Sequence, residues 1–135
     1  MTSKIIYNGN LRTTATHLRS GVSIETDAPT DNNGKGERFS PTDLVATALG
    51  SCMLTLMGIA ADRMGLNIEG TTCEIEKVMA ANPRRISEVH VKMNVPNSSN
   101  FSEKNKAVLQ NTAMTCPVFQ SLHEDTIKTL DLSWS

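Results

Sequence analysis

Three cysteines are the side chains of this 135-residue chain best suited to covalent chemistry. Cys52 lies within an uncharged run from residue 44 to residue 61, Cys73 lies in a strand-like segment, and Cys116 directly precedes a proline. An odd number of widely spaced cysteines does not predict a disulfide framework. The N-terminal segment MTSKIIYNGN lacks the long apolar region of a secretory signal, so we expect a cytoplasmic protein. In that compartment a cysteine pair is more often catalytic or redox-sensing than structural.

Cys116 stands in the segment TCPVFQSLH, which has the pattern of a helix start. Pro117 suits the first helical position, so Cys116 is predicted at or beside the N-cap. The unpaired backbone N–H groups and the helix dipole there favour a thiolate and would lower the pKa of Cys116 from about 8.5. An ordinary capping residue is the alternative. His123 is expected at the end of this helix, as a C-cap residue.

Cys52 has no helix terminus near it. It lies roughly three turns into a predicted helix, beyond the useful range of the dipole, and its apolar setting disfavours the charged form. Taken alone it is interpreted as a core residue, which becomes reactive only if a cation reaches it from elsewhere. Cys73 stands beside Glu74 on a predicted strand and is interpreted as a core residue as well.

The sequence has no pattern that is typical of a metal or cofactor site. No C-x-x-C or H-x₃₋₅-H pair occurs, the three histidines are scattered, and no glycine-rich phosphate loop is present. A net charge of −1 and an aromatic content of 4% argue against binding to nucleic acid or to an anionic membrane surface. We therefore expect neither metal, cofactor nor nucleic acid as a partner.

The segment SPTDL opens the longest predicted helix. Ser40 fits the N-cap, Pro41 the first helical position and Asp43 the reciprocal position of a capping box. The helix is predicted to run to about Met64, where Gly65 can adopt the left-handed conformation that ends it.

The apolar residues of this helix lie on all of its faces, so it must be buried on nearly all sides or lie in a membrane. Its 18 uncharged residues reach only the lower limit for a membrane span, and several of them are small or polar. We therefore favour burial and expect no membrane association. Because one small domain rarely surrounds a helix completely, we expect an intertwined homodimer in which two such helices pack together.

The remaining sequence predicts strands on both sides of the long helix. Short β-branched segments predict strands at 4–9, 11–17 and 21–27, with a tight turn at Gly21 before the third and a polar loop at 28–39. The second half predicts strands at 66–80, 84–95 and 125–134 and helices at 103–113 and after Cys116. An irregularity at Glu88 suggests a bulge. The order indicates a single α+β domain over residues 1–135, with strands and helices segregated rather than in βαβ units.

Two motifs taken together, SPTDLVATALGSC and TCPVFQSLH, resemble the OsmC/Ohr family of osmotically inducible and organic hydroperoxide resistance proteins. The likeness covers essentially the whole chain. It implies an OsmC-like fold with antiparallel sheets around a long apolar central helix, assembled as an intertwined homodimer. It also implies a thiol-dependent peroxidase that reduces organic hydroperoxides in oxidative stress defence.

The resemblance assigns roles to two of the cysteines. Cys52 corresponds to the peroxidatic thiol, which a hydroperoxide converts to a sulfenic acid. Cys116 corresponds to the resolving thiol, which forms a disulfide with Cys52 that an external dithiol then reduces. In this family the reductant is typically a lipoyl-bearing protein. The apolar helix would line a pocket for the carbon tail of the peroxide.

The family also carries an activating arginine in the N-terminal hairpin. Arg12 matches its placement best, and Arg38, just ahead of the long helix, is a physical alternative. One departure from the family pattern is Thr42, because characterised peroxidases have a glutamate there that pairs with the arginine. Glu37 and Asp43 are the candidates to replace it.

A second interpretation of the same sequence is an OsmC-like small-molecule binding or redox-sensing protein without peroxidase turnover. The feature that separates the two interpretations is whether Cys52 and Cys116 approach within disulfide reach with an arginine at hand.

Overall fold

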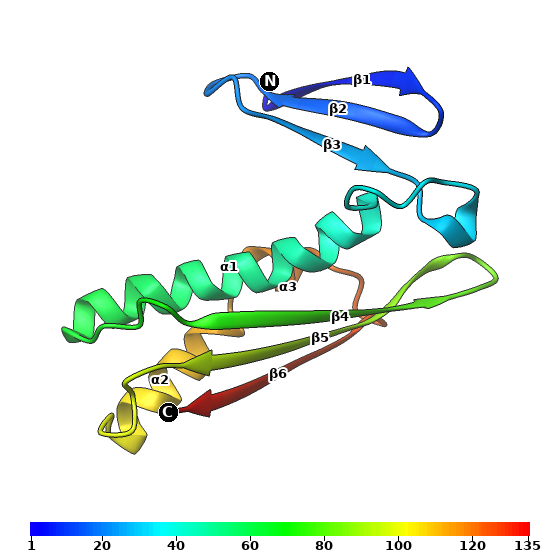
Figure 1. Ribbon diagram of the computed structural model, residues 1–135. Coiled ribbons are helices and arrows are strands. Elements are labelled where there is room, and N and C mark those ends of the chain that lie inside the picture. The colour runs from blue at the N-terminus through cyan, green and yellow to red at the C-terminus, as the bar shows by residue number, and fades with distance from the viewer. The chain divides into compact units, whose positions relative to one another are not determined.

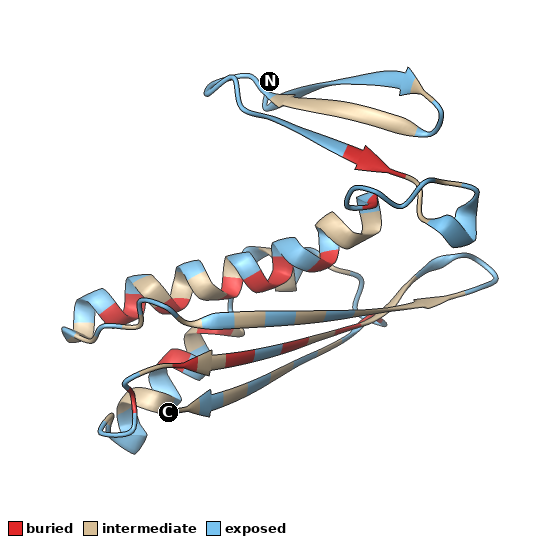
Figure 2. Cartoon of the chain, in the orientation of Figure 1, coloured by how far each residue is buried: buried red, intermediate tan, exposed pale blue.

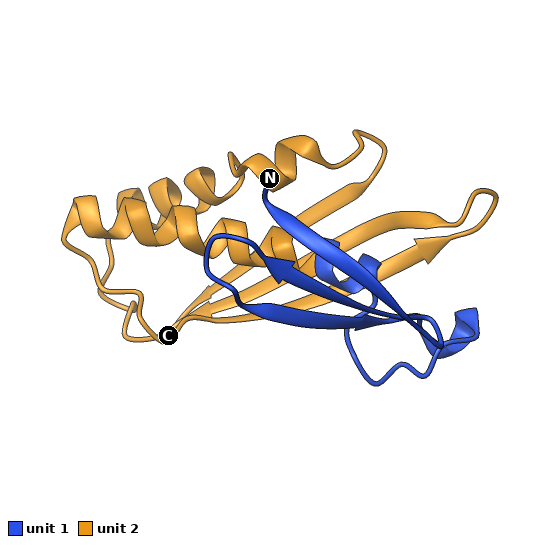
Figure 3. Cartoon of the chain, turned by 90° about the horizontal axis from the view of Figure 1, so that it is seen from above, with its two compact units in different colours: residues 1–45 blue, residues 46–135 orange.

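The computed structural model describes all 135 residues, which form two compact units. Unit 1 comprises residues 1–45 and unit 2 comprises residues 46–135 (Figure 3). The elements in chain order are β1 (Ser3–Gly9), β2 (Arg12–His17), β3 (Ser23–Asp27), a short 3-10 turn (Thr30–Asn32), α1 (Pro41–Met64), β4 (Thr72–Ala80), β5 (Arg85–Val95), α2 (Glu103–Ala113), α3 (Pro117–Ser121) and β6 (Ile127–Trp134) (Figure 1). The predicted α+β class and the predicted order of elements are confirmed.

Unit 1 is built on a three-stranded antiparallel sheet with the order β1-β2-β3. The turn between β2 and β3 places Gly21 at a φ of 75°, which confirms the predicted need for glycine there. The backbone N–H of Gly21 donates to the carbonyl of His17 at 2.8 Å and closes the turn. The polar loop that follows β3 holds the short 3-10 turn and leads to the start of α1.

The sheet of unit 1 exposes much of its apolar surface. Ile5, Ala15 and Ile24 are paired across the three strands and form one row of the sheet. Ile5 and Ile24 are nonetheless exposed, as is Tyr7. Every fully buried apolar side chain of the chain belongs to unit 2. A sheet normally buries one face against another layer, and unit 1 by itself supplies no such layer.

α1 begins and ends as the sequence predicts. The backbone N–H of Ser40 donates to the Asp43 carboxylate at 2.9 Å, and the Asp43 N–H donates to Ser40 Oγ at 3.0 Å, which completes the capping box. At the other end Gly65 has a φ of 66°, and the N–H of Leu66 donates to the carbonyl of Ala61 at 2.9 Å.

Only one face of α1 is buried within the chain (Figure 2). The buried residues are Ala46, Leu49, Gly50, Met53, Met57, Ala60 and Ala61. The opposite face carries exposed apolar side chains, among them Val45 and Ile59. By length and composition α1 could also cross a membrane, although its buried face packs in the core of unit 2 as a core helix does.

The sheet of unit 2 has the order β4-β5-β6, and here two predictions need correction. β4 and β5 pair antiparallel, but β6 pairs parallel to β5, so the expected all-antiparallel sheet is wrong. The reason is the connection, because α2 and α3 form a long crossover that returns the chain to the same end of the sheet. β4 also begins at Thr72 rather than at residue 66, because residues 66–71 are irregular and contain a turn in which Gly70 has a φ of 82°.

The pairing of β4 with β5 shifts at one point, as the sequence suggested. Val78 pairs with Glu88 and Met79 pairs with Ile86, so Ser87 is the extra residue of a bulge. Its hydroxyl donates to the carbonyl of Val78 at 3.1 Å.

One face of this sheet and the three helices share a single apolar cluster. Val89, Val91, Met93 and Val95 of β5 are buried in it, together with Leu109 of α2 and Cys116 beside α3. α1 approaches β4 closely at Gly50, where a Cβ would lie 2.6 Å from Ile75 Cδ1 and 2.9 Å from Cys73 Sγ. The absence of a side chain at this position therefore sets how near the helix lies to the sheet.

Candidate active site

The structure brings Cys52 and Cys116 together within unit 2. Cys52 lies on α1 and is half-buried, whereas Cys116 lies directly ahead of α3 and is fully buried. Both belong to the same apolar cluster, the Cys52 thiol is near enough to raise the pKa of Cys116, and both are free rather than joined in a disulfide. Of the three cysteines, the two that the sequence motifs single out are thus neighbours in space.

Cys116 occupies the N-cap position of α3, as predicted. Its Sγ accepts a hydrogen bond from the backbone N–H of Phe119 at 3.2 Å, as a capping serine would. Its carbonyl accepts the N–H of Gln120 at 3.1 Å, and Pro117 fills the first helical position. The sulfur therefore has a structural partner in addition to Cys52.

The predicted effect of this position on the pKa of Cys116 is wrong in direction. Burial raises the pKa of the Cys116 thiol above its ordinary value, and the neighbouring Cys52 adds to the rise. The hydrogen bond from the backbone N–H of Phe119 acts the other way but does not outweigh burial. A helix of one and a half turns offers a weak dipole, so the environment of Cys116 favours the neutral thiol.

Lys128 of β6 contacts α3 and the segment that follows it. The Lys128 ammonium lies 5.0 Å from the centre of the Phe119 ring and donates to the carbonyl of His123 at 3.1 Å. His123 itself lies beyond the helix, because α3 ends at Ser121 with Leu122 as its C-cap. The prediction that His123 ends the helix is therefore wrong, and the lysine of the next strand contacts this end of α3 instead.

Cys73 behaves as the core residue that the sequence predicts. It lies on β4, is half-buried and packs against the apolar cluster beside Gly50 of α1. Burial raises the pKa of its thiol, so the environment favours the neutral form there too.

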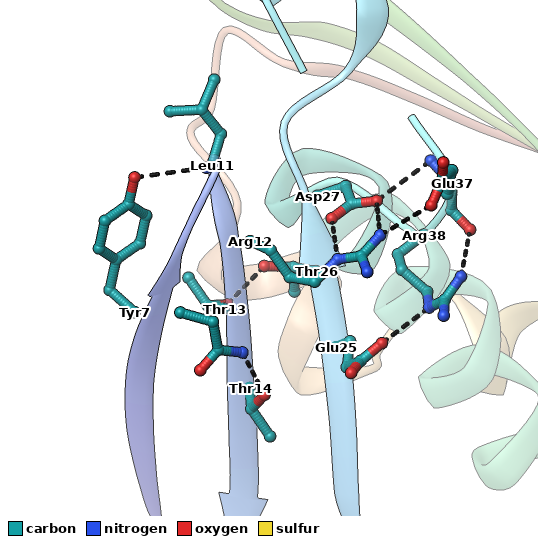
Figure 4. Close-up of polar contacts among 11 residues, drawn as sticks. Tyr7, Leu11, Arg12, Thr13, Thr14, Glu25, Thr26, Asp27, Glu37 and Arg38 are labelled. Atoms are coloured by element: carbon teal, nitrogen blue, oxygen red, sulfur yellow. Dashed lines mark hydrogen bonds and ion pairs between the residues drawn. The ribbon is translucent and has the colours of Figure 1, made fainter. Parts of the chain in front are cut away.

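A polar cluster surrounds Arg12 in unit 1 (Figure 4). Arg12 is the first residue of β2 and pairs across the sheet with Asp27, the last residue of β3. Its guanidinium donates to both carboxylate oxygens of Asp27, from Nε at 2.6 Å and from Nη2 at 2.8 Å. Nη2 also donates to Glu37 at 3.0 Å. Arg12 is thus held by two acidic side chains of its own unit.

These contacts raise the pKa of Arg12 and lower that of Asp27. For Arg12 the largest cause is the hydrogen bond to Asp27, followed by that to Glu37. For Asp27 the largest cause is the hydrogen bond from Arg12, which outweighs the effect of burial. Both groups are therefore charged at neutral pH.

The other residues weighed at this site have different partners. Arg38 donates to Glu25 at 2.9 Å and to the carbonyl of Glu37, so it lies in the same network but on another carboxylate. Asp43 serves the capping box of α1, and Thr42 Oγ1 lies 3.1 Å from Ser40 Oγ. Of the two candidates to replace the family glutamate, Glu37 contacts Arg12, at 3.0 Å.

Asp27 is the site residue that sequence reasoning missed. A signal for it existed, because the two predicted strands and the turn at Gly21 fix a hairpin register in which Arg12 faces Asp27. Opposite charges placed directly across two strands are expected to pair.

The chain is similar to known proteins both in sequence and in structure. The sequence model of the family described as OsmC-like protein matches residues 34–130, which is most of the chain. The chain belongs to the OsmC-like protein family. This family includes organic hydroperoxide resistance proteins. No curated protein matches the chain.

Solved structures agree with this assignment. A candidate osmotic stress induced and detoxification response protein from Psychrobacter arcticus is 53% identical, with a TM-score of 0.93 over 98% of this chain and 95% of that one. An organic hydroperoxide resistance protein OsmC from Legionella pneumophila is 15% identical, with a TM-score of 0.75 over 98% and 97%. An organic hydroperoxide resistance protein from Elizabethkingia anophelis is 15% identical, with a TM-score of 0.76 over 100% and 97%. The last two likenesses show the OsmC-like fold.

Proposed function

We propose that this protein is a thiol-dependent peroxidase that reduces organic hydroperoxides, with Cys52 as the peroxidatic thiol and Cys116 as the resolving thiol. The observation that carries the proposal is that these two free thiols, one half-buried and one fully buried, are neighbours in one apolar cluster. Family membership supports the same role in peroxide stress defence.

The first step is a two-electron oxidation of Cys52. Its thiolate attacks the distal oxygen of the hydroperoxide, so that an S–O bond forms as the O–O bond breaks. The alkoxide that leaves takes up a proton and departs as an alcohol, and Cys52 becomes a sulfenic acid. Cys52 is the better candidate for this step because Cys116 is fully buried and its environment favours the neutral thiol.

The second step forms a disulfide. The Cys116 sulfur attacks the Cys52 sulfur, an S–S bond replaces the S–O bond, and the hydroxyl group leaves as water with the proton of the Cys116 thiol. An external dithiol then attacks the disulfide, and a mixed disulfide resolves to regenerate both thiols. We propose a lipoyl-bearing protein as this reductant, in keeping with the family resemblance.

The setting of Cys52 supports an organic rather than a small polar peroxide. Ala48 and Leu56 lie one turn before and after it on α1, the first exposed and the second half-buried, and no charged residue occurs between residues 44 and 61. An alkyl or aryl tail gains from leaving water at such a surface, whereas hydrogen peroxide does not.

Two further parts complete the proposal. Arg12 is the proposed cation that favours the thiolate form of Cys52, since α1 itself offers no charge near that residue. The working form is proposed to be a cytoplasmic homodimer. The exposed apolar side chains of Ile5 and Ile24 in unit 1 and Ile59 on α1 support it, because they need a covering layer that a second copy can provide.

The experiment is peroxide consumption with cumene hydroperoxide and dihydrolipoamide as reductant. Wild-type protein is expected to turn over, Cys52→Ser to consume no peroxide, and Cys116→Ser to consume only the few equivalents that oxidise Cys52, without turnover. Cys73→Ser is the matched control and is expected to behave as wild type. If wild type binds the peroxide without consuming it, the non-enzymatic binding protein is the correct interpretation.

A further inference from the structure

The guanidinium of Arg12 has two acidic partners that hold it in different ways (Figure 4). Asp27 takes two hydrogen bonds, at 2.6 and 2.8 Å, and its side chain is only 2% exposed. Glu37 takes one hydrogen bond, at 3.0 Å, and its side chain is 57% exposed. Asp27 is therefore a buried, bidentate partner, and Glu37 is an exposed partner with one hydrogen bond.

Asp27 is fixed from several directions. Its carboxylate accepts the backbone N–H of Glu37 at 3.2 Å as well as the two bonds from Arg12. Its own N–H donates to the carbonyl of Phe39 at 3.2 Å, and its backbone is paired with Arg12 across the sheet. Paired N–H donors on a carboxylate fix the plane of the guanidinium as well as its distance. Asp27 therefore determines where Arg12 points.

Glu37 lacks these constraints. It lies in the polar loop that follows β3, and its carboxylate has a single bond to Arg12. An exposed ion pair of this kind is screened by water and must hold a long side chain in one rotamer, so it contributes little and exchanges readily. Its charge nonetheless offsets part of the positive charge of Arg12 while the bond is made.

We infer that Asp27 is the positioning residue for Arg12 in this protein, and that Glu37 is an exchangeable partner that tempers the charge of Arg12. Asp27 thereby takes the part that Thr42 cannot, since a threonine side chain brings no carboxylate. The consequence for Cys52 rests on the proposed function, in which Arg12 is the activating cation.

The two carboxylates are therefore expected to affect the reactivity of Cys52 in opposite directions. Asp27→Asn removes a negative charge, yet the amide cannot accept two charge-assisted bonds, so Arg12 loses its orientation and Cys52 becomes less reactive. Glu37→Gln also removes a negative charge but leaves the Asp27 pair intact, so the positive charge of Arg12 is less offset and Cys52 becomes more reactive. If only the loss of a negative charge mattered, both substitutions would change the reactivity of Cys52 in the same direction.

The test is the rate at which iodoacetamide alkylates Cys52, followed by mass mapping across a pH series. Arg12→Ala is the reference and is expected to be about tenfold slower at neutral pH, the effect of one unit in a thiol titration. Asp27→Asn should be slower by about the same factor, with the pH of half-maximal rate shifted upward. Glu37→Gln should be about twofold faster, the small change expected for an exposed pair. Glu103→Gln, which removes an exposed carboxylate of α2 that pairs with Lys106, is the control and should match wild type.

A second readout does not depend on Cys52. In ¹⁵N NMR the Arg12 Nε–H should exchange slowly with solvent in wild type and in Glu37→Gln, and rapidly in Asp27→Asn. Arg12→Lys keeps the charge without the paired donors, so its alkylation should also be slower than wild type by about tenfold. This variant replaces Asp27→Asn in the test if Asp27→Asn fails to fold. Equal shifts for the Asp27 and Glu37 variants, or a slow Nε–H in Asp27→Asn, would overturn the inference. If Arg12→Ala alone leaves alkylation unchanged, the NMR result still decides the anchoring, and the cation step of the proposed function is what fails.

Discussion

The Cys116 sulfur accepts the backbone N–H of Phe119 at 3.2 Å, and its thiol has Cys52 as a neighbour in the same apolar cluster. One atom therefore caps α3 and belongs to the proposed redox pair. A change at this sulfur, whether by mutation or by oxidation, alters the start of the helix that carries it.

The capping role predicts a difference between two small substitutions. Cys116→Ser keeps an acceptor for the Phe119 N–H, whereas Cys116→Ala removes it, and loss of an N-cap acceptor costs about 1 kcal/mol. We expect the alanine variant to have the lower free energy of unfolding in urea by about that amount. Equal stability of the two variants would show that the sulfur does not serve as a cap.

Gly50 predicts an effect on packing rather than on chemistry. Gly50→Ala places a methyl group against Ile75 and Cys73, and overpacking of this kind costs about 1 to 3 kcal/mol. Gly58→Ala is the matched control on the same helix, because a Cβ there meets nothing within 4 Å and the change gains up to about 1 kcal/mol of helix propensity. Urea unfolding should therefore rank Gly58→Ala above wild type and Gly50→Ala well below Gly58→Ala. If both variants shift alike, α1 does not depend on a close approach at Gly50.

The Arg12–Asp27 pair predicts how stability depends on pH. The pKa of Asp27 is lower in the folded protein than in the unfolded chain, so the pair stabilises the fold above the ordinary carboxyl pKa of about 3.9. This contribution is lost as the pH falls through the lowered folded value. The stability difference between wild type and Asp27→Asn should thus be full at pH 7 and shrink below about pH 4. A difference that stays constant from pH 7 to pH 2 would contradict the lowered pKa.

The proposed homodimer predicts a mass of twice 14.7 kDa in sedimentation at micromolar concentration. Ile24→Lys, on the exposed apolar row of unit 1, is expected to weaken assembly because a charge would be buried at the interface. Val108→Lys on α2 is a control at another exposed apolar position. A folded wild-type monomer at that concentration would refute the proposed assembly.

Local signals in the sequence account for most of the fold. The capping box at Ser40 and Asp43, the terminator Gly65 and the N-cap Cys116 are all decided by residues within one turn of each other, and each is confirmed. The alternation along β5 likewise depends on neighbours two residues apart.

The errors concern properties that depend on distant parts of the chain. The parallel pairing of β6 follows from the path of the crossover, which no residue of β6 encodes by itself. The pKa of Cys116 was predicted from its helix position, but burial by residues from other elements decides its direction. The pairing of Cys52 with Cys116 entered only through the family resemblance, since no local pattern relates two residues that far apart in sequence. The strand register is enough to predict that Asp27 pairs with Arg12, but it does not predict that Asp27 is buried.

The central claim is that Cys52 and Cys116 form a peroxide-driven redox pair. The most direct measurement is mass mapping of reduced protein after one equivalent of cumene hydroperoxide. We predict a single intramolecular Cys52–Cys116 disulfide in wild type, with Cys73 still a free thiol. Cys116→Ser should stop at a sulfenic acid on Cys52 and over-oxidise with excess peroxide, because nothing resolves it. Oxidation confined to Cys73, or no oxidation of Cys52 at all, would contradict the account.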